Sequence, residues 1–188
     1  MKAFDQYLQR RRIDRIRPYI KEGIRVLDIG CGGGELFNQI PAITDGIGLD
    51  PDMECDRKQG GVTLVKGMFP KDLPDKRPFD VITMMAVLEH IPEPQQLLLA
   101  ADCAQHLVPG GLVLITVPSA WVDPIIEVLL FLHIMDGTVG RSRSVDQHYG
   151  FDANKTPRIF VPCGLELVKA QKFQLGLNNF FAFRKPGK

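Results

Sequence analysis

The sequence lacks several features that would place it in a specialised class. Its four cysteines form no CxxC pair and match no zinc-site spacing, so we expect reduced thiols and no metal. The 23 basic and 22 acidic residues nearly cancel, so the charge calls for neither a nucleic acid nor an anionic membrane as partner. The longest apolar stretch, 124–135, is too short for the roughly 20 residues of a membrane-spanning helix.

No signal-peptide pattern, repeat or low-complexity segment is present either, and we expect a cytoplasmic protein. The chain has 188 residues, 45% of them hydrophobic, which suits a single globular domain spanning 1–188. Residues 4–20 follow the apolar period of an amphipathic helix, which makes 1–22 an N-terminal helical segment. Its many arginines predict a solvated face more than a nucleic-acid patch, because the rest of the chain balances their charge.

Short apolar runs ending in turn residues predict seven strands. These runs span 24–29, 46–49, 62–66, 79–84, 112–117, 166–172 and 178–184. The first five are nearly all apolar, as strands buried on both faces should be. Helical patterns separate several of them, at 33–40, 52–58 and 92–107. This alternation predicts an α/β fold, a three-layer sandwich with a mostly parallel sheet. Only 173–177 separates the last two strands, so we expect an antiparallel C-terminal hairpin at the sheet edge.

A glycine-rich turn follows the first predicted strand. Gly30, Gly32 and Gly33 lie between that strand and a helix, where the missing side chains let a ligand approach the backbone. The helix N-terminus offers free N–H groups to an anionic end of the ligand. Asp50 ends the second strand, twenty residues after Gly30, and is placed to accept both hydroxyls of a ribose. The combination indicates a nucleoside-containing ligand.

Two residues favour S-adenosylmethionine over NAD. The dinucleotide fingerprint GxGxxG requires a glycine at position 35, where this chain has Glu35. Asp28 lies inside the first strand, two residues before Gly30. An anion so near a pyrophosphate is unfavourable, whereas a ligand with an ammonium and a sulfonium favours it.

Four motifs then resemble, in order and spacing, those of class I S-adenosylmethionine-dependent methyltransferases. They are Val26–Gly34, Gly48–Asp50 with Phe79–Ile82, Leu88–Pro94 and Leu107–Leu112. Together they cover roughly residues 20–118 and are most similar to the small-molecule branch that includes ubiquinone-biosynthesis-type enzymes. The resemblance implies a Rossmann-like sheet and methyl transfer from S-adenosyl-L-methionine to a small-molecule acceptor, with S-adenosyl-L-homocysteine as product. The alternatives are a non-catalytic S-adenosylmethionine-binding or regulatory protein, or a methyltransferase acting on a macromolecule.

The resemblance also implies a set of cofactor-binding residues at the strand ends. These are Asp28, Gly30, Cys31, Gly32, Asp50, Pro51, Gly67, Met68, Phe69, Met84 and Met85. Asp28 would orient the ammonium, and Pro51 would lie on the adenine. At 67–69 the chain departs from the family, which often has Gly-Asp there. Met68, Phe69 or a backbone N–H would then replace the side-chain contact to adenine, with core packing as the competing role.

The acceptor site is expected in the variable region after the fifth strand. The resemblance makes 119–165 a substrate lid region, and the apolar stretch within it favours an apolar or aromatic acceptor. Trp121, Asp146 and Tyr149 are the candidate substrate residues. His148 is the candidate general base, because histidine titrates near neutral pH. His90 is a second candidate, although we favour a role in anchoring its loop. We expect a monomer or a homodimer.

Overall fold

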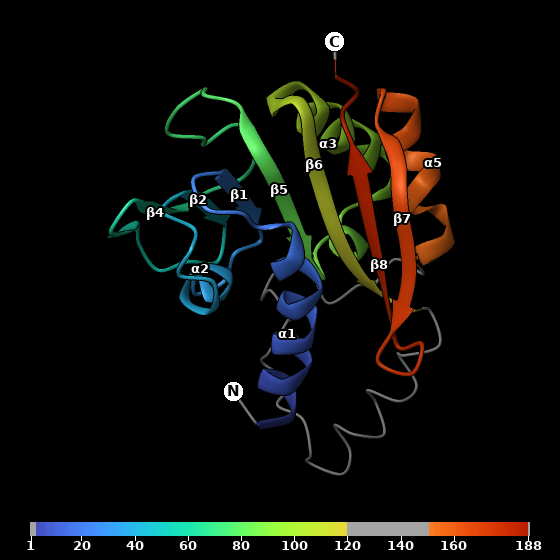
Figure 1. The fold of residues 1–188 in the computed structure, drawn as a ribbon, viewed down its shortest axis with the longest axis horizontal. Helices are drawn as coiled ribbons and strands as arrows, with labels where there is room; N and C mark the ends of the chain where they lie inside the picture. The colour runs from blue at the N-terminus through green and yellow to red at the C-terminus, as the bar shows by residue number, and fades with distance from the viewer. Residues whose placement is uncertain (1–2, 120–150, 188) are drawn as a thin grey trace.

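The computed structural model describes residues 3–119 and 151–187. Their strands form one eight-stranded sheet in the order β3-β4-β2-β1-β5-β6-β8-β7 (Figure 1). The strands are β1 (Arg25–Ile29), β2 (Asp45–Asp50), β3 (Arg57–Gln59), β4 (Val62–Lys66), β5 (Phe79–Met85), β6 (Leu107–Pro118), β7 (Glu166–Phe173) and β8 (Asn178–Arg184). All seven predicted strands are present, which confirms the fold class with one additional strand, β3.

The five central strands β4, β2, β1, β5 and β6 run parallel. The chain proceeds outward from β1 to β2 and then continues on the other side of β1 with β5. The order therefore reverses between β1 and β5. Ligands of open α/β sheets bind beyond the carboxyl ends of the strands at such a point. The glycine-rich turn follows β1, so the topology places it at this position.

Helices cover both faces of the sheet (Figure 1). On one face, α1 (Ala3–Ile16) and α2 (Glu35–Gln39) bury Ile13, Ile16, Leu36 and Phe37 in an apolar cluster. On the other, α3 (Glu93–His106) and α5 (Thr156–Phe160) contribute to a second cluster. The strands β1, β4, β5, β6 and β8 contribute side chains to both clusters in alternation, because successive side chains point to opposite faces of the sheet. None of the helices in the described ranges is long and apolar enough to cross a membrane.

The predicted helix at 4–20 ends earlier than its apolar pattern. After Ile16 the chain makes a 3₁₀ turn, η1 (Arg17–Tyr19), because Pro18 disfavours α-helical geometry at the residue before it. The expectation of a solvated arginine face was wrong for two side chains. Arg12 is partly buried and donates from Nε to Asn178 Oδ1 at 3.4 Å, and Arg15 lies 5.3 Å from the centre of the Phe173 ring. These arginines help to dock α1 on the sheet.

The predicted helix at 52–58 was also wrong. This segment carries only one buried apolar side chain, Met53, so it has no face to pack as a helix. The chain instead forms β3, which pairs antiparallel with β4 across a turn at Gly60 and Gly61. Gly60 has φ +59°, and a Cβ on Gly61 would lie 1.8 Å from the Thr44 carbonyl oxygen. Both positions of the turn therefore require glycine.

The C-terminal hairpin prediction is confirmed. β8 pairs antiparallel with both β6 and β7, and β7 is the outer strand. The helix α5 packs Phe160 on Phe183 with ring centres 5.0 Å apart. β6 begins at Leu107, five residues before the predicted start, with a register shift where Gly110 takes φ +81°. Residues 107–111 thus form a bulge at the beginning of β6.

A buried arginine joins the amino ends of the strands. Arg25 at the start of β1 donates from Nη2 to both carboxylate oxygens of Asp75 at 2.8 Å, and from Nη1 to Asp45 at 3.3 Å. Its guanidinium carbon lies 4.8 Å from the centre of the Phe79 ring. Arg77 pairs with the same two carboxylates. This network fixes the loop before β5 at the end of the sheet opposite the glycine turn.

Candidate functional site

At the glycine turn, the chain segments that end β1, β2 and β5 come close together. The N–H groups of Gly30 and Cys31 both donate to the carbonyl of Leu49, at 2.8 and 3.2 Å. Gly30 has φ +73°, and a Cβ there would lie 2.3 Å from Val87 Cγ2. The turn thus has no room for a side chain at Gly30, and the backbone beyond it, at exposed Gly32 and Gly33, is open to solvent.

Asp50 holds this turn in place. Its Oδ2 accepts from the Gly32 N–H at 2.9 Å, and its Oδ1 accepts from the Asp52 N–H at 2.8 Å. The second contact closes an Asx turn. Each carboxylate oxygen has two lone pairs, so both retain an acceptor site for a ligand hydroxyl. Pro51 follows Asp50 and is exposed.

Asp28 is the most perturbed carboxyl group at the site. It is only 1% exposed in the middle of β1. Its Oδ1 accepts from Thr83 Oγ1 at 2.6 Å, while its Oδ2 has no hydrogen-bond partner among the described residues. Burial raises the pKa of Asp28 to about 7, the Thr83 hydrogen bond opposes this, and the charges of Glu35 and Asp50 raise it further. A buried acceptor without a donor indicates a missing partner.

Glu35 is a site residue that the sequence used only to argue against NAD. It begins α2, and its carboxylate folds back over the turn, 2.8–3.1 Å from where a Cβ on Gly33 or Gly32 would lie. Three carboxylates therefore surround the glycine turn. Arg57 of β3 also reaches this turn, donating to the Gly33 carbonyl at 3.0 Å. These carboxylate acceptors suit a ligand with cationic groups and vicinal hydroxyls, and they fit S-adenosylmethionine better than a pyrophosphate.

The exit of β4 differs from the sequence expectation. The Met68 N–H, one of the proposed replacements for an adenine contact, donates to Asp72 Oδ2 at 2.8 Å. Phe69 packs into the core and meets the His106 ring edge-on at 5.2 Å. Met68 is 61% exposed, and a Cβ on Gly67 would lie 2.5 Å from Asp72 Cβ. Asp72, which the sequence analysis missed, is the acidic side chain at this strand end, and its only signal was its position five residues after Gly67.

The exit of β5 combines core packing with an unusual backbone. Met84 is fully buried in the sheet core, and Met85 is half-buried against the opposite cluster. The next residue, Ala86, has φ +57° and donates its N–H to the Thr116 carbonyl at 2.8 Å. Positive φ is uncommon for residues other than glycine, and such backbone strain often occurs at ligand sites. Ala86 lies one residue before Val87, the neighbour of Gly30.

His90 ends a short 3₁₀ turn, η2 (Leu88–His90), after β5. Its N–H donates to the Val87 carbonyl at 3.0 Å. Gln96 of α3 also ties this loop to the helix: it is buried and donates from Nε2 to the Ile91 carbonyl at 2.8 Å and the Leu88 carbonyl at 3.4 Å. Nothing in the sequence pattern distinguished Gln96 from other polar helix residues.

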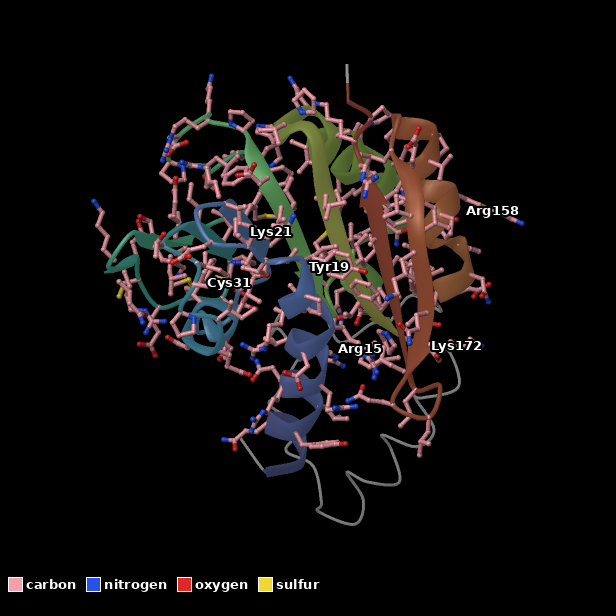
Figure 2. All side chains as sticks on the ribbon, in the orientation of Figure 1. Arg15, Tyr19, Lys21, Cys31, Arg158 and Lys172 are labelled. Carbon is pink, nitrogen blue, oxygen red and sulfur yellow. The ribbon has the colours of Figure 1, made fainter. Side chains whose placement is uncertain are left out.

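Cys31 lies beside the glycine turn next to α2 (Figure 2). Its side chain is buried, with Sγ 3.9 Å from Met53 Sδ. Burial and the charges of Asp28, Asp50 and Glu35 raise the pKa of the thiol, so it stays protonated. Cys31 is therefore a packing residue of the turn and not a nucleophile. Within the described ranges no group of histidines, cysteines and carboxylates is arranged to hold a metal.

The remaining candidates, His148, Trp121, Asp146 and Tyr149, lie outside the described residues. The described residues of the site are therefore the candidate cofactor-binding residues, at the carboxyl ends of β1, β2, β4 and β5.

Sequence comparisons agree with this geometry. A family model described as a methyltransferase domain matches residues 1–161. The ubiquinone biosynthesis O-methyltransferase of Shewanella sp. (strain ANA-3) is 30% identical over 118 residues, covering 57% of this chain and 49% of the relative. The enzyme of that name from Xanthomonas euvesicatoria pv. vesicatoria is 36% identical over 99 residues, covering 47% and 41%. The chain thus spans about half the length of these curated relatives.

Solved structures share the fold. A chain from the complex of the Haloferax volcanii methyltransferase activator Trm112 with a methyltransferase superposes with a TM-score of 0.71 at 17% identity, covering 99% of this chain and 94% of that one. The N-methyltransferase NodS of Bradyrhizobium japonicum WM9, solved with S-adenosyl-L-homocysteine, gives 0.67 at 14% identity, covering 97% and 88%. With the family match over most of its length, the chain belongs to the class I S-adenosylmethionine-dependent methyltransferase family.

Proposed function

We propose that this protein transfers the methyl group of S-adenosyl-L-methionine to a small aromatic or apolar acceptor. The observation that carries the proposal is the pairing of Asp28 and Asp50 around the glycine turn. Asp28 supplies a buried acceptor oxygen without a donor, and Asp50 supplies two acceptor oxygens held by the N–H groups of Gly32 at 2.9 Å and Asp52 at 2.8 Å. When bound, the cofactor supplies a methyl group activated by a sulfonium.

The residues of this chain have binding and positioning roles. Asp28 accepts from the ammonium through Oδ2, and Asp50 accepts from the two ribose hydroxyls. Asp72, next to Gly67 at the end of β4, is the candidate acceptor for the adenine amino group, since the Met68 N–H is already engaged. Displacement at a sulfonium needs an aligned nucleophile and exclusion of water more than covalent help. Fixed geometry of this kind contributes about 7–11 kcal/mol in favourable cases.

The similarity to O-methyltransferases favours a phenolic or other hydroxyl acceptor. A hydroxyl must lose its proton during the transfer, so a general base is expected. His148 is our candidate base, and His90, which lies in η2 at the carboxyl end of β5, is the second. We expect His148→Ala to lower the rate of methyl transfer without weakening cofactor binding. If His90→Ala has that effect and His148→Ala does not, the assignment is reversed.

The decisive experiment is calorimetric titration with S-adenosylmethionine, S-adenosylhomocysteine and NAD. We expect micromolar binding of the two sulfur nucleosides and none of NAD. Asp50→Ala should abolish this binding, while Asp52→Ala, which removes a neighbouring exposed carboxylate but keeps the backbone donor to Asp50, should not. Because Asp50 also holds Gly32, Asp50→Asn is a gentler second variant that retains one acceptor oxygen.

Turnover is then measured with a panel of phenols and catechols, by release of S-adenosylhomocysteine. Release that depends on one of these acceptors supports the proposal. Binding of the cofactor without release for any acceptor would identify a non-catalytic S-adenosylmethionine-binding protein. Absence of cofactor binding would refute the proposal entirely.

A further inference from the structure

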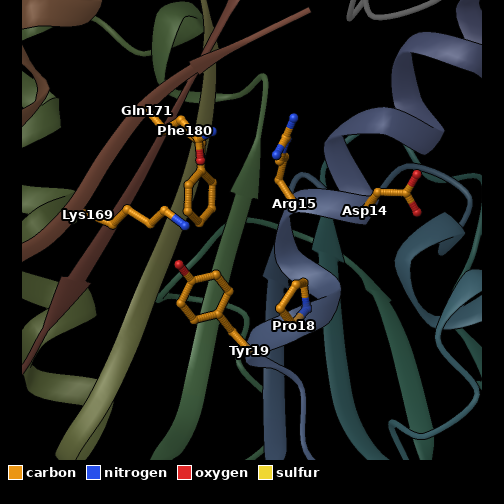
Figure 3. A pocket seen from close by; sticks show the side chains of 7 residues that line it. All are labelled: Asp14, Arg15, Pro18, Tyr19, Lys169, Gln171 and Phe180. Carbon is orange, nitrogen blue, oxygen red and sulfur yellow. The ribbon is translucent and has the colours of Figure 1, made fainter.

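A second pocket lies on the face of the sheet that carries α1, away from the glycine turn. It opens between the α1–η1 segment and the hairpin β7–β8, and Figure 3 shows Arg15 and Tyr19 on one side, Lys169 and Gln171 on the other, and Phe180 between them. None of the candidate cofactor residues lines it. In Figure 1, α1 stands between this position and α2, so the pocket is separate from the methyl-donor site.

The floor of the pocket is aromatic. Phe180 is only 1% exposed, and the Tyr19 ring lies 5.6 Å from it, centre to centre, at an angle of 39°. The cavity encloses about 110 Å³, several times the 10–15 Å³ that one water molecule needs. It therefore has room for a small planar group.

The rim of the pocket is rich in hydrogen-bond donors and poor in acceptors. Lys169 and Arg15 are both cationic, and no carboxylate in the described part of the chain pairs with either. Asp14, the one acidic residue of the lining, pairs with Arg17 at 3.6 Å. The Tyr19 hydroxyl has no hydrogen-bond partner among the described residues and can donate. Lys169, Arg15, whose guanidinium also lies over the Phe173 ring, and the Tyr19 hydroxyl surround an aromatic floor and match an anion that carries a flat apolar body.

We propose that this pocket binds a small organic anion, a carboxylate attached to a planar apolar group. The carboxylate accepts from the ammonium of Lys169, the Tyr19 hydroxyl and the Arg15 guanidinium, and the apolar body packs mainly on the half-buried ring of Tyr19, above the buried Phe180. Such a ligand connects α1 to the edge strand β7. The proposal is independent of the methyltransferase function, and its failure would leave that function unaffected.

The test uses benzoate as the probe, with benzamide as its neutral counterpart and inorganic phosphate as an anion without an apolar body. Binding is followed by ¹⁵N chemical-shift titration of the full chain. We expect benzoate to shift the amide signals of Tyr19, Lys169 and Gln171 with a dissociation constant in the millimolar range, as for other ligands of about nine heavy atoms. Benzamide and phosphate should each bind several times more weakly.

Lys169→Gln should weaken benzoate binding about fivefold, the upper end of what one exposed ion pair contributes. Lys172→Gln is the matched control, because Lys172 is an exposed lysine on the same strand that does not line the pocket. Both side chains are exposed, so neither change threatens the fold. Equal binding of benzoate and benzamide, equal binding of benzoate and phosphate, or equal weakening by the two lysine variants would each overturn the proposal.

Discussion

Replacing Asp28 with asparagine should stabilise the protein above pH 7 and leave its stability nearly unchanged near pH 4. Burial, together with the charges of Glu35 and Asp50 and against the Thr83 hydrogen bond, raises the pKa of Asp28 from 3.8 to about 7. Between these two values the folded protein keeps a proton that the unfolded chain has released. The free energy of unfolding therefore falls as the pH rises through this window.

The size of the effect follows from the two pKa values. One pKa unit corresponds to about 1.36 kcal/mol. The shift therefore lowers the free energy of unfolding by roughly 4 kcal/mol above pH 7, where Asp28 is ionised, and by about 1.5 kcal/mol at pH 5, where the folded protein still keeps the proton. Asparagine removes this cost because it carries no charge. Its side-chain carbonyl still accepts from Thr83 Oγ1, which now lies 2.6 Å from Asp28 Oδ1, so the local packing is retained.

Urea denaturation at several pH values between 4 and 8.5 measures the difference between the two proteins. We expect the stability gained by Asp28→Asn to grow with pH and to level off above pH 7. Asp52→Asn, which removes one exposed negative charge near the same turn, controls for the change in net charge. A gain that does not depend on pH, or a loss of stability at pH 8, would refute the reasoning.

Three further predictions concern the cofactor affinity and the residues that stabilise the sheet and its glycine turn. The affinity of the wild-type protein for S-adenosylmethionine should rise between pH 6 and 8 as Asp28 ionises, and calorimetry should show no such rise in Asp28→Asn. Gly30→Ala should lower the free energy of unfolding by more than 2 kcal/mol because its Cβ collides with Val87, whereas Gly110→Ala, with positive φ but open space, should cost only about 1–2 kcal/mol. Arg25→Met should cost about 2 kcal/mol in urea denaturation, because it removes the two contacts to Asp75 and leaves only the more exposed Arg77 to pair with that carboxylate.

The parallel core could be predicted because its strands are local in sequence. Each buried strand is a short apolar run closed by turn residues, and β4 and β8 were predicted with the boundaries that the structure shows. The hairpin of β7 and β8 followed from a five-residue connection that is too short for a crossover. The segment at 52–58 could not be predicted in this way, because β3 exists through its pairing with β4 and not through an apolar pattern of its own.

The residues of the candidate site also fall into two groups, those that the sequence identified and those that it did not. Gly30, Asp28 and Asp50 were identified from sequence because their spacing within one strand–turn–helix–strand unit carries the signal. Asp72, Gln96 and Glu35 also contact residues that are near in sequence, but they match no motif, so the sequence did not identify their roles.

What the sequence determined by itself was the family, the order of the strands along the chain and the residues of the glycine turn, since these depend on local spacing and periodicity. The tertiary structure alone decided which carboxyl group is buried without a second donor and which arginines of α1 dock on the sheet. It also brought Arg15 and Tyr19 to one pocket with Lys169, although more than 140 residues of chain separate them. Burial and pairing between distant segments arise from packing, which no local pattern encodes.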